Sequence, residues 1–224
     1  GPGNKFVTMA KKIIYGETGI DFIAGPSEIL IIADESANPK CIAADLLAQA
    51  EHDEAAIPSL ITTSETIKQQ VQSALKIQIQ NLSTKNIASK ALKNGIFEVI
   101  HKKEDIINKV NQIAPEHLEL MVSDVSNWIP FLTNFGALFI GNNSAEVFGD
   151  YCSGPNHILP TNQAAMYTGG LHFKDFVKIV SYQEVTDEAV SILANLGSKM
   201  AELEGLMAHR NAALLRKANY GEKM

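Results

Sequence analysis

Four short stretches of the chain gather residue types that bind metals and move protons. They lie at positions 49–52, 115–117, 150–157 and 204–209 and are rich in His, Glu, Asp and Gln. A purely structural chain has little reason to place acids and imidazoles beside runs that it must bury, as the second and third stretches do. We therefore expect an active site that is assembled from distant segments around a metal ion.

The first stretch places two candidate ligands on one predicted helix. Gln49 and His52 are three residues apart, so their side chains project from the same face about one turn apart. This spacing suits two ligands of one metal ion. The alternative is a solvated helix end, because the apolar stripe fades after Ala50 and Gln is an unusual zinc ligand. Spacing alone leaves both interpretations open.

The second stretch places an acid and an imidazole at the entry to a predicted buried strand. Glu116 and His117 follow Pro115 directly, and strand ends are where α/β sheets carry their sites. His titrates near neutral pH, and burial can raise the pKa of a Glu toward the same range, so the pair could manage two proton transfers. The alternative is a loop Glu and a strand-edge His that satisfy structural hydrogen bonds.

The third stretch is predicted to be a glycine-punctuated loop that follows a strand. Gly149 and Gly154 let the backbone approach a ligand closely. Asp150, Asn156 and His157 supply groups that can bind a metal or donate and accept hydrogen bonds. A structural loop rarely needs this density of polar functional types, so we interpret the loop as part of a site.

The fourth stretch lies in the last predicted helix. Glu204 and His209 are five residues apart. Five residues turn a helix by about 140°, so the two side chains cannot share a narrow face. Both can reach one site only if the helix end points at it, or if Gly205 marks a break. An ordinary helix surface is the default interpretation.

Several familiar motifs are missing from the sequence. No GxGxxG follows a predicted strand, so a self-contained dinucleotide site is not supported, and neither GxSxG nor a Walker loop occurs. We interpret Cys41 and Cys152 as structural or incidental. The turn at 24–28 precedes the first predicted strand and carries the spare hydroxyl of Ser27.

The composition is that of an ordinary globular protein. The 224 residues are 46% hydrophobic and 20% charged, which allows one sizeable domain or two small ones. A net charge of −6 argues against a nucleic-acid surface, which needs clustered Lys and Arg. Two cysteines fit a reducing compartment, and no apolar run reaches the length of a membrane span. We expect a cytoplasmic protein that binds neither nucleic acid nor membrane.

Strand-like and helix-like runs alternate along most of the chain. Apolar runs bounded by Gly, Pro, Asp or Ser predict strands at 28–33, 59–63, 97–101, 118–122 and 137–141. Helices are predicted at 6–14, 39–52, 64–82, 85–93, 103–113 and 125–133, and the segment 187–219 is predicted to be wholly helical. This order predicts an α/β fold with a mainly parallel sheet covered on both faces, followed by a small helical appendage.

Taken jointly, these segments resemble the second half of histidinol dehydrogenase. The resemblance covers essentially the whole chain, and the order and spacing of its segments make it specific. The matching stretches are 1–4, 24–34, 45–52, 114–119, 149–161 and 204–209. The chain departs from the family at Pro155, where Thr is usual, and at Ile23, where Pro is common. The resemblance implies that the N-terminal half of the family's chain is absent here.

The resemblance implies a zinc-dependent enzyme that oxidises L-histidinol to L-histidine. The oxidation takes two NAD-linked steps through an aldehyde and completes histidine biosynthesis. Because the N-terminal half should hold most contacts to NAD, we expect this chain by itself to reduce little or no NAD. The alternatives are a family member that oxidises another polar alcohol and a truncated, non-catalytic zinc-binding or dimerisation module.

The resemblance also assigns roles residue by residue. Glu116 and His117 would be the proton-transfer pair, and Asn4 would be the last remnant of the NAD site. The zinc ligands would be Gln49, His52, Asp150 and His209. The substrate-binding residues would be Ser27, Gln49, His52, His117, Asp150, His157, Glu204 and His209.

The resemblance finally implies a domain plan and an assembly. Its fold is an incomplete Rossmann-like sheet with a small C-terminal helical domain. Residues 1–26 would be a remnant of the NAD-binding domain, 27–171 the main α/β domain with the zinc and catalytic residues, and 172–224 a helical dimerisation domain. In the implied homodimer, Glu204 and His209 would reach into the site of the partner subunit, which would explain their awkward spacing on the helix.

Overall fold

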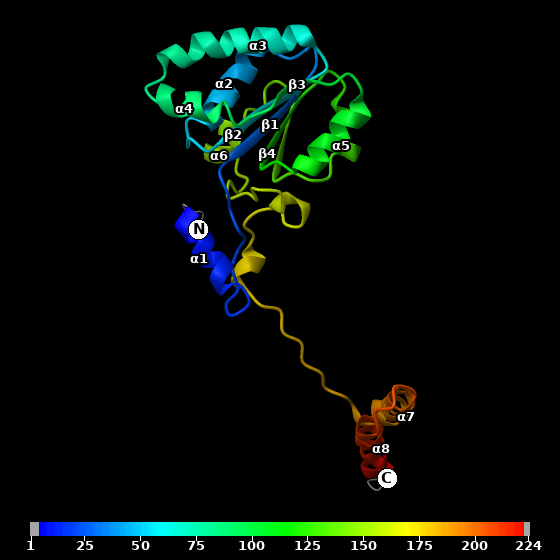
Figure 1. Ribbon diagram of the computed structural model, residues 1–224. Helices are drawn as coiled ribbons and strands as arrows, with labels where there is room; N and C mark the ends of the chain where they lie inside the picture. The colour runs from blue at the N-terminus through cyan, green and yellow to red at the C-terminus, as the bar shows by residue number, and fades with distance from the viewer. Residues whose placement is uncertain (1–4, 222–224) are drawn as a thin grey trace. The chain divides into compact units, whose positions relative to one another are not determined.

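A computed structural model describes residues 5–221 of the chain (Figure 1). Its contacts divide the chain into two compact units, one up to Val177 and the other from Lys178 onward. The first unit is an α/β sandwich and the second is a pair of helices. Asn4 lies outside the described residues.

A five-stranded parallel sheet forms the centre of the first unit. Its order is β3-β2-β1-β4-β5, with every neighbouring pair parallel. The strands are β1 (Glu28–Ala33), β2 (Ile57–Thr62), β3 (Phe97–Val99), β4 (His117–Met121) and β5 (Ala137–Ile140). This sheet confirms the predicted α/β class, and each strand overlaps a predicted one.

Two apolar clusters cover the two faces of the sheet. On one face pack α2 (Pro39–Ala50), α3 (Glu65–Gln78) and α4 (Lys85–Ala91), and on the other packs α5 (Lys103–Ile113) (Figure 1). The central strand β1 is buried throughout and sends Ile29 and Ile31 to the first cluster and Leu30 and Ile32 to the second. A strand covered on both faces reads as a continuous apolar run, which is why β1 was readable from sequence.

Local signals fix several boundaries. The side chain of Asn38 caps α2 by accepting from the backbone N–H of Lys40, and Pro39 occupies the first turn, where its missing N–H costs nothing. Before β3, Gly95 lies so close to the Pro58 carbonyl oxygen that a Cβ would come within 1.7 Å of it. Only glycine permits this approach.

Three predictions of secondary structure were wrong, two of them in the first unit. The helix predicted at 125–133 is instead two short 3-10 turns, η2 (Val125–Asn127) and η3 (Ile129–Phe131). Pro130 lacks the N–H that a continuous helix would need there. The loop predicted at 149–157 begins within a helix, α6 (Glu146–Tyr151), so Asp150 is a helical residue.

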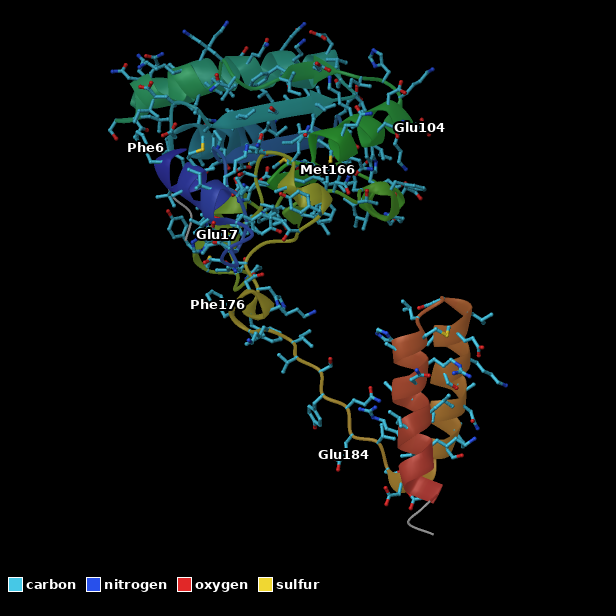
Figure 2. All side chains as sticks on the ribbon, turned by 60° about the horizontal axis from the view of Figure 1, so that its bottom comes forward. Phe6, Glu17, Glu104, Met166, Phe176 and Glu184 are labelled. Carbon is cyan, nitrogen blue, oxygen red and sulfur yellow. The ribbon has the colours of Figure 1, made fainter. Side chains whose placement is uncertain are left out.

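The remaining elements of the first unit are short. They are α1 (Lys5–Ile14), η1 (Ile79–Asn81), η4 (Ala164–Met166) and η5 (Phe173–Phe176). Met166 and Phe176 carry exposed side chains on the last two of these turns (Figure 2).

The second unit consists of α7 (Asp187–Leu203) packed on α8 (Met207–Gly221). The expectation that 187–219 is wholly helical was wrong at 204–206. Gly205 adopts a left-handed backbone conformation, φ 75°, and ends the first helix, as one of the two alternatives for this segment required. Among the described helices, none combines the length and apolar character that crossing a membrane requires.

Candidate active site and metal centre

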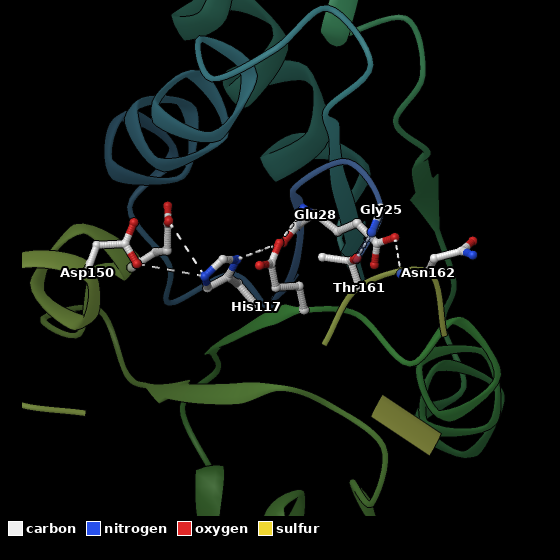
Figure 3. Close-up of polar contacts among 8 residues, drawn as sticks. Gly25, Glu28, His117, Asp150, Thr161 and Asn162 are labelled. Carbon is white, nitrogen blue, oxygen red and sulfur yellow. Dashed lines mark hydrogen bonds and ion pairs between the residues drawn. The ribbon is translucent and has the colours of Figure 1, made fainter. Parts of the chain in front are cut away.

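The candidate site lies where β1 and β4 begin. Glu28 is the first residue of β1, and His117 opens β4 in register with Ile29 (Figure 3). Glu116 immediately precedes His117. Open α/β sheets usually bind ligands beyond the carboxyl ends of their strands. These residues lie at the opposite, amino edge of the sheet, at the entry to a buried strand as predicted.

The backbone around Glu116 and His117 is held from both sides. Ala114 caps the end of α5, and its left-handed conformation, φ 49°, turns the chain toward Pro115. The carbonyl of Pro115 accepts the N–H of Gly136, and that of Glu116 accepts the N–H of Ala137, which begins β5. The two candidate catalytic side chains therefore start from a rigid backbone.

One hydrogen bond decides which nitrogen of His117 carries a proton. Its Nδ1 lies 2.8 Å from the backbone oxygen of Glu28. A carbonyl oxygen only accepts, so Nδ1 must donate and a neutral imidazole must keep its lone pair on Nε2. That Nε2 is buried and has no hydrogen-bond partner among the described residues.

The surroundings of His117 favour its neutral form. Burial lowers the pKa of this imidazole, and the hydrogen bond to Glu28 and the charge of Asp150 oppose the shift only in part. Nε2 lies 3.8 Å from Oε1 of Glu146 and 3.9 Å from Oδ1 of Asp150 (Figure 3). His117 is thus a neutral base that faces two carboxyl groups.

Glu116 is a buried carboxyl with a shifted pKa. Its Oε2 accepts the backbone N–H of Glu28 at 2.9 Å, and the residue is 7% exposed. Burial, together with the charges of Glu28, Glu146 and Asp150, raises the pKa of Glu116 to about 8, although the hydrogen bond from the Glu28 N–H opposes the shift. A carboxyl with this pKa can gain or lose a proton near neutral pH.

The end of α2 supplies the next two groups. Gln49 is 1% exposed, and its Oε1 is buried without a hydrogen-bond partner within residues 5–221. An unpaired buried amide oxygen is costly, so it points to a missing partner. His52 follows just beyond the helix end and is exposed.

A group that could hold a metal ion lies between this helix end and α6. Ligand atoms of His52, Glu146 and Asp150 all lie within 4.8 Å of one another. Zinc takes imidazole nitrogen and carboxylate oxygen, so this donor set fits zinc. Burial and the charge of Asp150 raise the pKa of Glu146 to about 8, as expected where carboxyl groups crowd together.

A cavity of about 370 Å³ opens beside this group. Asp150 and His157 both line it, together with Pro155 and residues of β5. The structure therefore brings Asp150 and His157, both predicted site residues, to one cavity.

Comparison with known proteins identifies the family. A family model described as histidinol dehydrogenase matches residues 1–217. The chain belongs to the histidinol dehydrogenase family. It is 45% identical over 217 residues to the histidinol dehydrogenase of Lactococcus lactis, covering 96% of this chain and 50% of that protein. The histidinol dehydrogenase of Thermus thermophilus is 40% identical, covering 97% of this chain and 53% of the relative.

A solved structure agrees with this assignment. The crystal structure of histidinol dehydrogenase from Elizabethkingia anophelis matches with a TM-score of 0.92 and 42% identity, over 99% of this chain and 51% of that one. The chain spans about half the length of the histidinol dehydrogenases it matches.

Three of the remaining predicted residues lie in different units of the chain. Ser27 is half-buried and directly precedes Glu28. Glu204 and His209 belong to the second unit, where both are exposed: Glu204 follows the end of α7 and His209 lies in the first turn of α8.

Sequence reasoning missed three acidic residues of this region, namely Asp45, Glu119 and Glu146. Two signals in the sequence could have found Glu119 and Glu146. Glu119 interrupts an apolar strand between Leu118 and Leu120, where a buried charge needs a reason. Glu146 precedes Asp150 by four residues, the spacing of two ligands on one helix face.

Proposed function

We propose that this chain contributes to an NAD-linked oxidation of L-histidinol to L-histidine through an aldehyde in a cytoplasmic biosynthetic enzyme. The family supports the substrate, and the free cysteines Cys41 and Cys152 suit a reducing compartment. The observation that carries the chemistry is the Nε2 of His117, an unpaired buried base beside a group of potential metal ligands.

His117 and Glu116 form the proton-transfer pair of this proposal. Oxidation of an alcohol requires a base to remove the hydroxyl proton as hydride leaves, and Nε2 of His117 is the available lone pair. Glu116 lies on the other side of the imidazole, with its Oε2 3.6 Å from Nδ1. Its raised pKa suits a group that exchanges protons with water near neutral pH.

The second oxidation needs a hydrated or covalently bound aldehyde. A cysteine could form a covalent adduct, but Cys152 is exposed and Cys41 lies in the first turn of α2, at the opposite end of that helix from Gln49. We therefore propose that a base-activated water adds to the aldehyde, with Glu116 or His117 as the base.

Zinc would be held by Gln49, His52, Asp150 and His209. The buried Oε1 of Gln49 and the convergence of His52 with Asp150 support the first three ligands. When bound, zinc would hold the imidazole and amine of the substrate and polarise nearby oxygen. Ser27, His157 and Glu204 would contact the substrate, and Asn4 would contact NAD.

We also propose a homodimer whose sites are shared between subunits, with the domain plan 1–26, 27–171 and 172–224. The support lies on α7, which exposes a row of large apolar side chains. They are Ile192, Leu196, Met200 and Leu203. Such a row is typical of an interface, and a second copy of the chain would bring His209 to the partner's Gln49 and His52.

Removing a ligand tests the metal site. We expect His52→Ala and Asp150→Ala each to lower zinc affinity by about tenfold or more, because either change deletes a donor from a four-ligand set. Titration of zinc against a chromophoric chelator measures the change. If both variants bind zinc as tightly as the parent protein, His52 and Asp150 are not zinc ligands.

Mixing two defective chains tests the sharing of sites. We expect dimers of His52→Ala with His209→Ala chains to recover about half a zinc per chain, because one of their two sites would again hold every ligand. Metal analysis of heterodimers purified with two different tags gives the stoichiometry. If heterodimers form and bind no zinc, all ligands come from one chain.

A further inference from the structure

A buried carboxyl beneath the candidate site has no role in the proposed chemistry. Glu119 lies on β4, two residues after His117, so both side chains leave the strand on the same face. It is 1% exposed. A carboxyl in such a place is costly to bury, and an aliphatic residue would satisfy the strand equally well. The position therefore calls for a reason other than packing.

One oxygen of Glu119 holds the start of α6. Its Oε1 accepts the backbone N–H of Glu146 at 3.0 Å. The helix α6 has only six residues, and the residue before it, Ala145, has no side chain that can cap it. Helix starts leave N–H groups that need acceptors. Glu119 supplies the acceptor from the neighbouring strand and so anchors the helix that carries Glu146 and Asp150.

The other side of Glu119 faces α2. The Oε2 atom of Glu119 is buried and has no hydrogen-bond partner among the described residues. The Asp45 carboxyl lies against that of Glu119, so one proton shared between the two groups would supply the missing hydrogen bond. Asp45 is one helical turn before Gln49, on the same face of α2.

We propose that Glu119 and Asp45 form a positioning pair that sets the spacing between the end of α2 and α6. The pair joins the helix that carries Gln49 and leads to His52 with the helix that carries Glu146 and Asp150. Neither member binds the metal or the substrate. The inference rests on the proposed metal site. It states that these two residues hold the ligands of that site at the required distance from one another.

The test separates the effect of side-chain volume on zinc affinity from the effect of hydrogen bonding, at the single buried position 119. Zinc alone is titrated into the 224-residue chain against a chromophoric chelator, and the melting temperature of the metal-free protein is recorded. Glu119→Leu keeps the volume and loses the acceptor, whereas Glu119→Gln keeps an acceptor for Glu146 and a donor toward Asp45. We expect Glu119→Leu to weaken zinc affinity by about 10- to 100-fold and Glu119→Gln to weaken it by less than about threefold.

Met121→Ala is the matched control. Met121 lies on the same strand and face as Glu119, two residues further on, and is equally buried. This change should lower the melting temperature because it opens a cavity, yet leave zinc affinity within about threefold of the parent. Equal losses of affinity in Met121→Ala and Glu119→Leu at equal melting temperature would reduce Glu119 to a packing residue and overturn the proposal.

Asp150→Ala separates the inference from the site on which it rests. If Asp150→Ala loses zinc while Glu119→Leu keeps it, the site stands and the positioning pair is wrong. If Asp150→Ala also keeps zinc, the metal site itself is wrong and the pair fails with it. Should Glu119→Leu not fold, Asp45→Ala on the half-buried side of α2 replaces it. About tenfold weaker zinc binding supports the pair, and unchanged binding overturns it.

Discussion

Replacing His117 by Asn is expected to lower turnover of L-histidinol by about 10²- to 10⁴-fold in a full-length protein that carries these residues. Asn can still donate a hydrogen bond toward the Glu28 carbonyl, but it has no counterpart of the Nε2 lone pair. Zinc content should remain close to that of the parent, because His117 is not among the proposed ligands. Steady-state NAD reduction and metal analysis of the same samples measure both quantities.

Glu116→Gln serves as the companion variant. It preserves the shape of the neutral carboxyl and the acceptor for the Glu28 N–H, but it cannot exchange a proton. We expect turnover to fall far more than zinc content here as well. Nearly full activity in both variants would exclude the pair from proton transfer.

The second large effect is a loss of stability with rising pH in the zinc-free protein. The pKa of Glu116 is raised from 4.5 to about 8 in the folded chain. Between these values the folded state keeps a proton that the unfolded state has lost, so the free energy of unfolding falls as pH rises and the loss is complete above about pH 8. From pH 6.5 to 8 this carboxyl alone should cost on the order of 2 kcal/mol.

Glu116→Gln removes this source of pH dependence. Urea unfolding with a chelator present, at several pH values between 6.5 and 8, should give a shallower decline for the variant than for the parent. The decline should not vanish, because burial raises the pKa of Glu146 to about 8 as well. Measurements above pH 6.5 stay clear of His117, whose lowered pKa acts on stability at lower pH. Identical slopes in parent and variant would contradict the burial argument.

The sequence predicts the sheet well because strands that are buried on both faces consist almost entirely of apolar residues. The run 29–32 is buried on both faces and contains only Ile and Leu. The prediction of a helix at 125–133 was wrong because the apolar spacing of this segment suits a helix, whereas Pro130 limits it to single turns. The short helix α6 escaped notice because it contains Gly149 and is capped from another strand, which no local pattern reveals.

The candidate site was predictable in part for a similar reason. Gln49 and His52 could be recognised as candidates from their helical spacing. Glu116 and His117 could be recognised because they lie at the start of an apolar strand. The resemblance to a known family supplied their roles. Glu119 and Glu146 could have been noticed from the sequence, as a charge within an apolar strand and by the spacing to Asp150. Their contacts between β4, α2 and α6 are tertiary and could not be assigned from neighbouring residues.

The acceptor that fixes the imidazole of His117 is a main-chain oxygen, so no side-chain substitution at position 28 can delete it. The proton on Nδ1 is therefore secured by strand alignment, since His117 and Ile29 are paired in β4 and β1. A slip of one residue between these strands would turn the imidazole to the opposite face of the sheet. A chain with misaligned strands would therefore be inactive and not merely slower. The activity of a sample would then be proportional to the fraction of its molecules that are correctly folded.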